Sequence, residues 1–173
     1  MNLSFSTRGW QSFRWEENLQ TAELCEFGGI ELYNPHLEES LVGRGGPFHK
    51  YGVAATIRSL RAKKLQIPCI DTSCDLSNGG AESVHQAMQL AHDAKVEYVS
   101  AVALTDDEAA VRAALEILLP AARALGVTLL LKTSGIYADT GRLRLLLDEC
   151  ACDELAALWD MHHPYGISAR API

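Results

Sequence analysis

The sequence predicts an α/β fold in which parallel strands alternate with helices. The first observation is a repeat: a short apolar run followed by a stretch with helical spacing recurs roughly every 30 residues, the length of a βα unit. The second is that apolar runs end in polar residues, such as Asp71, Lys132 and Asp160. In parallel α/β folds chemistry gathers at the carboxyl ends of the strands, so these residues are candidates for a functional site.

Composition narrows the class of protein. The 173 residues suffice for one domain with a real core, and the chain is 48% hydrophobic and 21% charged. The net charge of −7 argues against a nucleic-acid groove or an anionic membrane surface, because both need clustered Lys and Arg. No apolar run approaches the ~20 residues of a membrane span, and the N-terminus lacks the apolar region of a signal peptide. We expect a single cytoplasmic domain over 1–173, without nucleic-acid or membrane partners.

The cysteines do not form a metal or disulfide pattern. Five is an odd number, and the Cys150-Ala151-Cys152 spacing is too tight for the usual zinc ribbon. We expect reduced thiols that are mostly buried.

The first part of the chain predicts a strand over 3–6, a helix over 15–27 and a second strand over 30–33 that carries Glu31. The helix has apolar residues on one stripe, and Gly28 follows it as glycine commonly follows a helix end. Glu31 is a candidate substrate-binding residue because it lies inside an otherwise apolar strand.

The longest stretch without periodicity is 34–52. It carries Arg44, His49 and Lys50, which give it positive character within an acidic chain. Long loops in compact domains are often binding loops, so Arg44 and His49 could meet a carboxylate or phosphate of a small substrate. An ordinary solvated loop explains the stretch equally well.

The remaining pattern continues the alternation. It predicts helices over 53–64, 82–94, 105–125 and 142–150, and strands over 67–70, 98–104 and 127–131. Thr105 can cap the third of these helices, and Pro120 predicts a break or kink within it. Asp71 follows the strand over 67–70 and is a candidate substrate-binding residue.

The last strand is predicted over 156–160 and ends in Asp160, followed by His162 and His163. An apolar run that ends in an acid beside two histidines is typical of a functional strand end. The alternative is that Asp160 caps a turn and both histidines are solvated.

Six such strands fit either an open doubly wound sheet or most of a (β/α)₈ barrel. The residues after the first strand, 7–10, do not match the G-x-G-x-x-G pattern of nucleotide-binding sheets. We therefore predict a parallel (β/α) barrel of the TIM type that is incomplete, with about six βα units and strands seven and eight absent. Six strands cannot close a barrel built for eight. We expect another copy or a partner chain to cover the open edge.

Four segments resemble the sugar isomerase/epimerase superfamily with the xylose-isomerase-like TIM barrel, and together they span the chain in order. They are LSFSTRG at 3–9, FGGIELYN at 27–34, VTLLLKTSG at 127–135 and ALWDMHHPYG at 157–166. The resemblance implies a protein that acts on a small carbohydrate, phosphorylated or not, by proton transfer at the C-terminal mouth of the barrel.

The resemblance also implies a divalent metal (Mn, Mg, Zn or Co) held by a Glu ending strand five, an Asp ending strand six, a His from strand seven and a Glu from strand eight. The Asp corresponds to Asp160 and a substrate-contacting His to His163, but Lys132 stands at the Glu position. The other two ligands have no counterpart. We therefore expect no metal in this chain, and Asp160 as a ligand only if the missing strands are supplied.

Two hypotheses follow. The chain is either an isomerase-like or epimerase-like enzyme with catalytic residues Asp160, Lys132 and His163 and substrate contacts that include His162, or a non-catalytic binding or scaffold module with a degenerate pocket. Lys132 as a Schiff-base lysine is a third possibility. Neighbouring parallel strands lie ~4.8 Å apart, so we expect Lys132 to reach Asp160 or His163 across the pocket.

Overall fold

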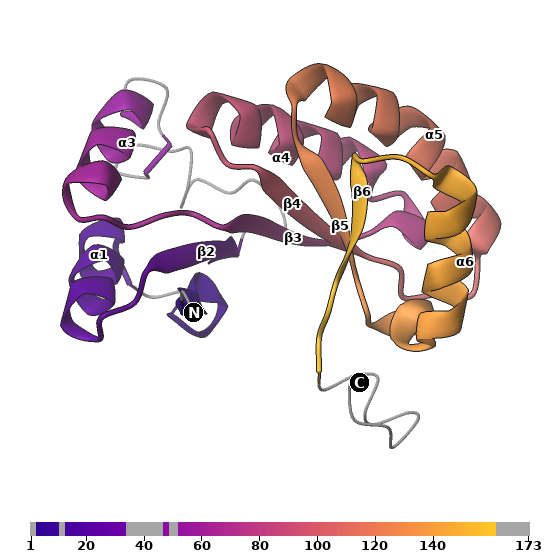
Figure 1. The fold of residues 1–173 in the computed structure, drawn as a ribbon, viewed down its shortest axis with the longest axis horizontal. Coiled ribbons are helices and arrows are strands. Elements are labelled where there is room, and N and C mark those ends of the chain that lie inside the picture. The colour runs from indigo at the N-terminus through magenta and orange to yellow at the C-terminus, as the bar shows by residue number, and fades with distance from the viewer. Residues whose placement is uncertain (1–2, 11–12, 34–46, 49–51, 162–173) are drawn as a thin grey trace.

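A computed structural model describes residues 3–10, 13–33, 47–48 and 52–161. Strands and helices alternate along this chain (Figure 1). The strands are β1 (Ser4–Ser6), β2 (Gly29–Tyr33), β3 (Cys69–Asp75), β4 (Tyr98–Val102), β5 (Thr128–Lys132) and β6 (Leu155–Leu158). The helices are α1 (Trp15–Leu24), α3 (Val53–Ala62), α4 (Ala81–Ala94), α5 (Glu108–Leu125) and α6 (Thr140–Cys150).

The strands form one sheet in the sequential order β1-β2-β3-β4-β5-β6, and every neighbouring pair is parallel. The helices surround the strands on the outside of the sheet (Figure 1). Within the described ranges, β1 and β6 each pair on one side only, so the sheet is not closed. The predicted incomplete barrel with parallel strands in sequential order is confirmed.

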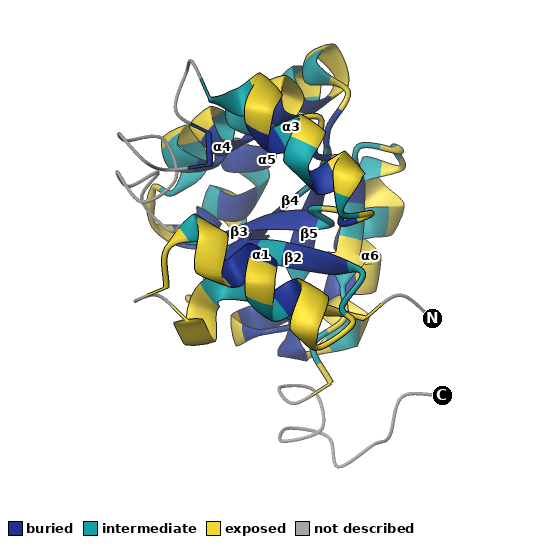
Figure 2. Cartoon of the chain, turned by 90° about the vertical axis from the view of Figure 1, so that its left-hand side faces the viewer, coloured by how far each residue is buried: buried dark blue, intermediate teal, exposed yellow. Residues whose placement is uncertain are grey.

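The two faces of the sheet differ in chemistry. Ile30, Ile70, Val99 and Leu129 are fully buried and form the core with apolar side chains of α4 and α5, such as Met88. Figure 2 shows buried residues along the strands and exposed ones on the outer surfaces of the helices. Because side chains alternate along a strand, the residues between these apolar ones point to the opposite, concave face.

The concave face carries the polar strand residues. The strand register places Ser100 beside Asp71 on one side and beside Leu130 on the other. Lys132 lies two residues beyond Leu130 and therefore on the same face. Glu31 lies two residues before Tyr33 in β2 and therefore on the same face. Tyr33 is paired with Asp71. The sheet thus buries its apolar face under helices and turns a polar face inward.

The helix α5 runs from Glu108 through Pro120 to Leu125, so the predicted break at Pro120 is wrong. Pro120 has no backbone N–H to donate to the Glu116 carbonyl, four residues earlier in the helix. Both residues are exposed. Water can hydrate that carbonyl, which lets the helix continue. The predicted cap is also wrong: Asp107, not Thr105, caps the helix by accepting from the Ala110 backbone N–H at 2.9 Å.

The strand β3 is longer than predicted and continues through Asp71 to Asp75. Its register with β4 shifts between Asp71 and Asp75, and Ser73 within this stretch has a φ of 49°. A bulge of this kind bends a strand and re-aims its side chains.

In the described part of the chain, no helix is long and apolar enough to cross a membrane.

Candidate functional site

An ion pair between β3 and β5 lies at the centre of the candidate site. The Lys132 ammonium donates a hydrogen bond to Asp71 Oδ2 at 2.5 Å. The exposed fraction is 13% for the Lys132 side chain and 2% for that of Asp71. Charged side chains are rarely this buried unless they are paired. The sequence therefore places two opposite charges on the concave face of a sheet whose other face is apolar.

Asp71 accepts further hydrogen bonds through its other oxygen. Oδ1 receives the Ser100 hydroxyl at 3.0 Å, the Ser73 backbone N–H at 3.0 Å and the Ser73 hydroxyl at 3.3 Å. Both contacts from Ser73 lie within the bulge of β3, where the Asp71 carboxylate accepts from the residue two positions further on, as in an Asx turn. Asp71 is therefore held from three directions.

Lys132 reaches Asp71 across an intervening strand. β3 and β5 are not neighbours, since β4 pairs with both. The residue of β4 beside Asp71 is Ser100, which is fully buried and small. A serine there leaves space for the long lysine side chain and also donates to the carboxylate that the lysine meets.

Cys69 and Glu31 also lie on the concave face. Cys69 is two residues before Asp71 in β3, and Glu31 is two residues before Tyr33 in β2. Burial raises the pKa of the Cys69 thiol to about 12, and the negative charge of Glu31 adds to this effect. A hydrogen bond with Ser100 and the positive charge of Lys132 act in the opposite direction. Cys69 therefore stays protonated at neutral pH, and it is not a nucleophile.

The predicted strand-end acid Asp160 is half-buried just beyond β6. Its backbone N–H donates to the Thr133 hydroxyl at 2.7 Å, and the Thr133 N–H donates to the Leu158 carbonyl at 3.0 Å. These contacts bring the ends of β5 and β6 together. The direct contact expected between Lys132 and Asp160 is wrong, because the ion pair of Lys132 is made with Asp71, on the opposite side from β6. Contact of Lys132 with Asp160 through one water molecule stays a prediction. His163, the other expected partner, lies outside the described residues, as do His162, Arg44 and His49.

Sequence reasoning missed Ser100, Ser73, Cys69 and Thr133. Ser100 had a usable signal, since it is the one small polar residue in the apolar run 98–104. Ser73 had none, because its contacts depend on a bulge. The prediction that the cysteines are mostly buried is wrong, because Cys69 is buried but Cys25 is exposed and the other three are half-buried. The place of Cys69 beside the site was not predicted.

The described residues do not fit a divalent metal. Within those ranges no group of three or more His, Cys, Asp and Glu side chains could hold a metal ion. An ammonium lies against Asp71, where a metal would need oxygen ligands facing a shared centre.

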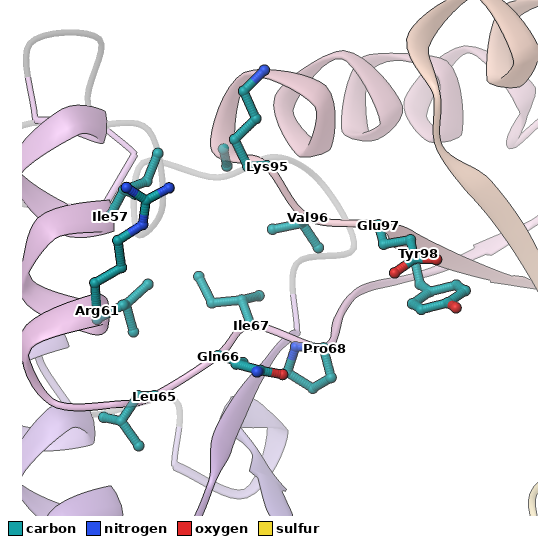
Figure 3. Close-up of a pocket in the computed structure, with 12 residues that line it drawn as sticks. Ile57, Arg61, Leu65, Gln66, Ile67, Pro68, Lys95, Val96, Glu97 and Tyr98 are labelled. Carbon is teal, nitrogen blue, oxygen red and sulfur yellow. The ribbon is translucent and has the colours of Figure 1, made fainter.

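A cavity of about 370 Å³ lies elsewhere, between α3 and the end of α4 (Figure 3). Residues that precede β3 and β4, including Ile67 and Val96, line it, so it is at the amino ends of the strands. Arg61 and Lys95 lie on opposite sides of it (Figure 3). In barrels of this type that end of the sheet serves stability, so the candidate site remains at the carboxyl ends.

No protein-family model matches the chain, and no curated protein sequence matches it. Solved structures do match. The probable 3-DHS dehydratase AsbF from Bacillus anthracis is 20% identical, with a TM-score of 0.73 over 94% of this chain and 64% of its own. The 3-keto-D-glucoside 4-epimerase YcjR from E. coli is 13% identical, with a TM-score of 0.75 over 97% of this chain and 71% of its own.

The third match is the IOLI protein, determined with a binding zinc atom. It is 14% identical, with a TM-score of 0.79 over 97% of this chain and 66% of its own. The chain thus spans about two thirds of the length of these structures. Identities this low show the fold alone. The chain has the fold of the xylose-isomerase-like TIM barrels, in an incomplete form with six parallel strands.

Proposed function

We propose that the concave face binds a small carbohydrate at the carboxyl ends of the strands and acts on it by proton transfer, as an isomerase or epimerase does. The observation that carries the proposal is the buried Lys132–Asp71 pair, which lines this face beside Glu31. An ammonium donates to sugar oxygens, while carboxylates accept from sugar hydroxyls. The names of two structural neighbours, a dehydratase and an epimerase, support chemistry of this class.

Proton transfer needs a base and a group that stabilises the developing oxyanion. Lys132 can provide the positive charge, and Asp160 and Glu31 are the candidate bases. Asp160 lies just beyond β6, and Glu31 lies on the pocket face of β2. His163 and His162 are proposed to contact the ligand from the same side as Asp160, and Arg44 and His49 from the loop 34–52.

The alternative function is binding without catalysis. It is favoured by Lys132, which stands where the resemblance places an acidic residue at the end of strand five. A binding module would need the site's shape and polarity but no mobile proton.

Ligand-observed NMR in D₂O separates the two functions. A panel of pentoses, hexoses and their phosphates is incubated with the protein. Saturation transfer to a sugar with loss of a carbon-bound proton signal to deuterium supports the enzyme. Transfer without exchange supports the binding module, and no transfer to any sugar contradicts both.

We further propose that a partner covers the open edges of the sheet. This partner would be a second copy of this chain or another chain. Near β1, the side chains of Leu3, Trp10 and Phe13 are 56%, 43% and 37% exposed. Beyond β6, Trp159 and Met161 are 46% and 68% exposed. Apolar residues beside unpaired strands favour association. A sedimentation series of the wild-type protein and Trp10→Glu tests this, and a wild-type protein that stays monomeric and unbound would contradict it.

We also propose the cytoplasmic location expected from the sequence. It is supported by Cys25, Cys69, Cys150 and Cys152, which form no disulfide, the usual state in a reducing compartment.

A further inference from the structure

We propose that Lys132 is a fixed cation that binds an oxygen of the ligand, and that Asp71 and Ser100 position it, so that the site needs neither a divalent metal nor a Schiff base. The inference rests on the proposed function, because it concerns the carbohydrate site described there. It assigns a role to each member of the ion pair and reverses the expectation that Lys132 serves Asp160.

Asp71 is a positioning residue rather than a base. An ionised carboxylate offers about four acceptor positions. Four hydrogen bonds, from the Lys132 ammonium, the Ser100 hydroxyl and the N–H and hydroxyl of Ser73, reach the two oxygens. The residue is 1% exposed, so neither water nor a ligand approaches it freely. A carboxylate held in this way can fix a neighbour but is poorly placed to accept a proton.

Lys132 has donor capacity beyond this contact. An ammonium carries three N–H groups, and the bond to Asp71 engages one of them. The side chain starts at the last residue of β5 and keeps 13% of its surface exposed. A ligand oxygen on the concave face can therefore meet the ammonium while Asp71 holds it from the other side.

The same contact argues against a covalent role. A Schiff base begins with attack by the uncharged amine on a carbonyl carbon. An amine that donates to a buried carboxylate at 2.5 Å is held as the ammonium, which has no free electron pair. Lys132 is thus suited to polarise a carbonyl oxygen rather than to attack the carbon.

A divalent cation fits this arrangement poorly. A cation bound to Asp71 would lie beside the Lys132 ammonium, and like charges a few ångströms apart repel strongly at a site with little water. It would also compete with three neutral donors for Asp71 Oδ1 and with the ammonium for Oδ2. The lysine therefore supplies the local positive charge that the carbohydrate needs.

Ser100 completes the arrangement. It lies beside Asp71 in the sheet, is fully buried and donates to Oδ1. A larger side chain there would stand between β3 and β5 and push the lysine away from the carboxylate. Ser100→Ala should keep the ion pair, whereas Ser100→Val should displace it.

The experiment uses D-xylose and D-fructose as probes with the wild-type protein. Saturation-transfer NMR in EDTA first measures binding. Acetylation of each lysine is then quantified by mass spectrometry, with and without the sugar that binds. Lys63, which pairs with Glu23 on the surface, is the control. We expect the sugar to slow acetylation of Lys132 several-fold and to leave Lys63 unchanged.

Variants sharpen the result. We expect Lys132→Met to weaken sugar binding at least 10-fold and Lys63→Met to leave it unchanged, with circular dichroism confirming that both fold. The acetylation comparison needs no variant, so it decides the matter if Lys132→Met fails to fold. We also expect Ser100→Val to weaken binding more than Ser100→Ala does, because the alanine removes one hydrogen bond to Asp71 whereas the valine also displaces the lysine.

The outcomes separate the two proposals. If neither these two sugars nor any other sugar of the panel binds the wild-type protein, the proposed function fails and this inference falls with it. If a sugar binds but leaves Lys132 unprotected, or binds only after Mn²⁺ is added, this inference alone is wrong. A sugar adduct trapped on Lys132 by borohydride would also overturn it.

Discussion

The substitution Asp71→Asn tests the energetics of the buried ion pair. An amide of the same shape can still accept from Ser100 and Ser73 through its oxygen, but it leaves the Lys132 ammonium without its counter-charge. Breaking a buried pair by removing one partner costs about 3–5 kcal/mol. Lys132 is 13% exposed and can turn partly toward water, so we expect the lower end, about 3 kcal/mol. For a chain of 173 residues this corresponds to a fall in Tm of roughly 6–12 °C.

Urea unfolding and thermal melts of four proteins measure the effect: wild type, Asp71→Asn, Lys132→Met and the double variant. Removing both charges leaves no unpaired ion, so the double variant should lose less stability than the sum of the single variants by about 1–3 kcal/mol. A loss below 1 kcal/mol for Asp71→Asn, or single effects that simply add, would refute the reasoning.

Three further predictions concern other parts of the fold. Cys69, whose pKa burial raises to about 12, should resist iodoacetamide at pH 8 in the native protein and react once unfolded, as peptide mass spectrometry will show. Gly135→Ala should lower the free energy of unfolding in urea by about 2 kcal/mol or more, because Gly135 has a φ of +58° and a methyl group there would overlap the Ala103 carbonyl just after β4. Gly126→Ala, at a residue with open space around it, should lower it by about 1 kcal/mol. A hydrogen bond from Arg123 lowers the pKa of Glu154 from 4.5 to about 2, so the stability that this pair contributes is present above pH 4.5 and is lost as the pH falls toward 2. Glu154→Gln should therefore flatten the dependence of unfolding free energy on pH between these two values.

Much of the fold follows from the sequence because its signal is repetitive. Each apolar run followed by a helical stretch can only form a βα unit, and the sequential order of parallel strands follows from short crossovers. The observed ends of strands and helices differ from the predicted ones where local backbone geometry determines them. Ser73 extends β3 by a bulge, and exposed Pro120 is tolerated inside α5 because water replaces the lost donor.

Two of the predicted site residues, Asp71 and Lys132, lie together in the structure, but their pairing was not predicted. Asp71 and Lys132 were identified because both follow apolar runs, and carboxyl ends of parallel strands meet at one edge. The partner of Lys132 was not, because adjacency in sequence order favours Asp160 on the neighbouring strand. The choice depends on the small Ser100 between β3 and β5, and on the curvature of the sheet, which brings alternate strands together on the concave face. A pattern of residues along one chain does not contain that curvature.

We infer that Lys132 supplies the positive charge on the concave face of this barrel. A crystal structure of the protein soaked in Mn²⁺, with anomalous scattering recorded near the manganese edge, tests this inference. We expect Lys132 Nζ against Asp71 Oδ2 on the concave side of the parallel strands, with no anomalous peak at Asp71 or Asp160. A manganese peak at either carboxylate, or a Lys132 side chain turned outward between the helices, would contradict it.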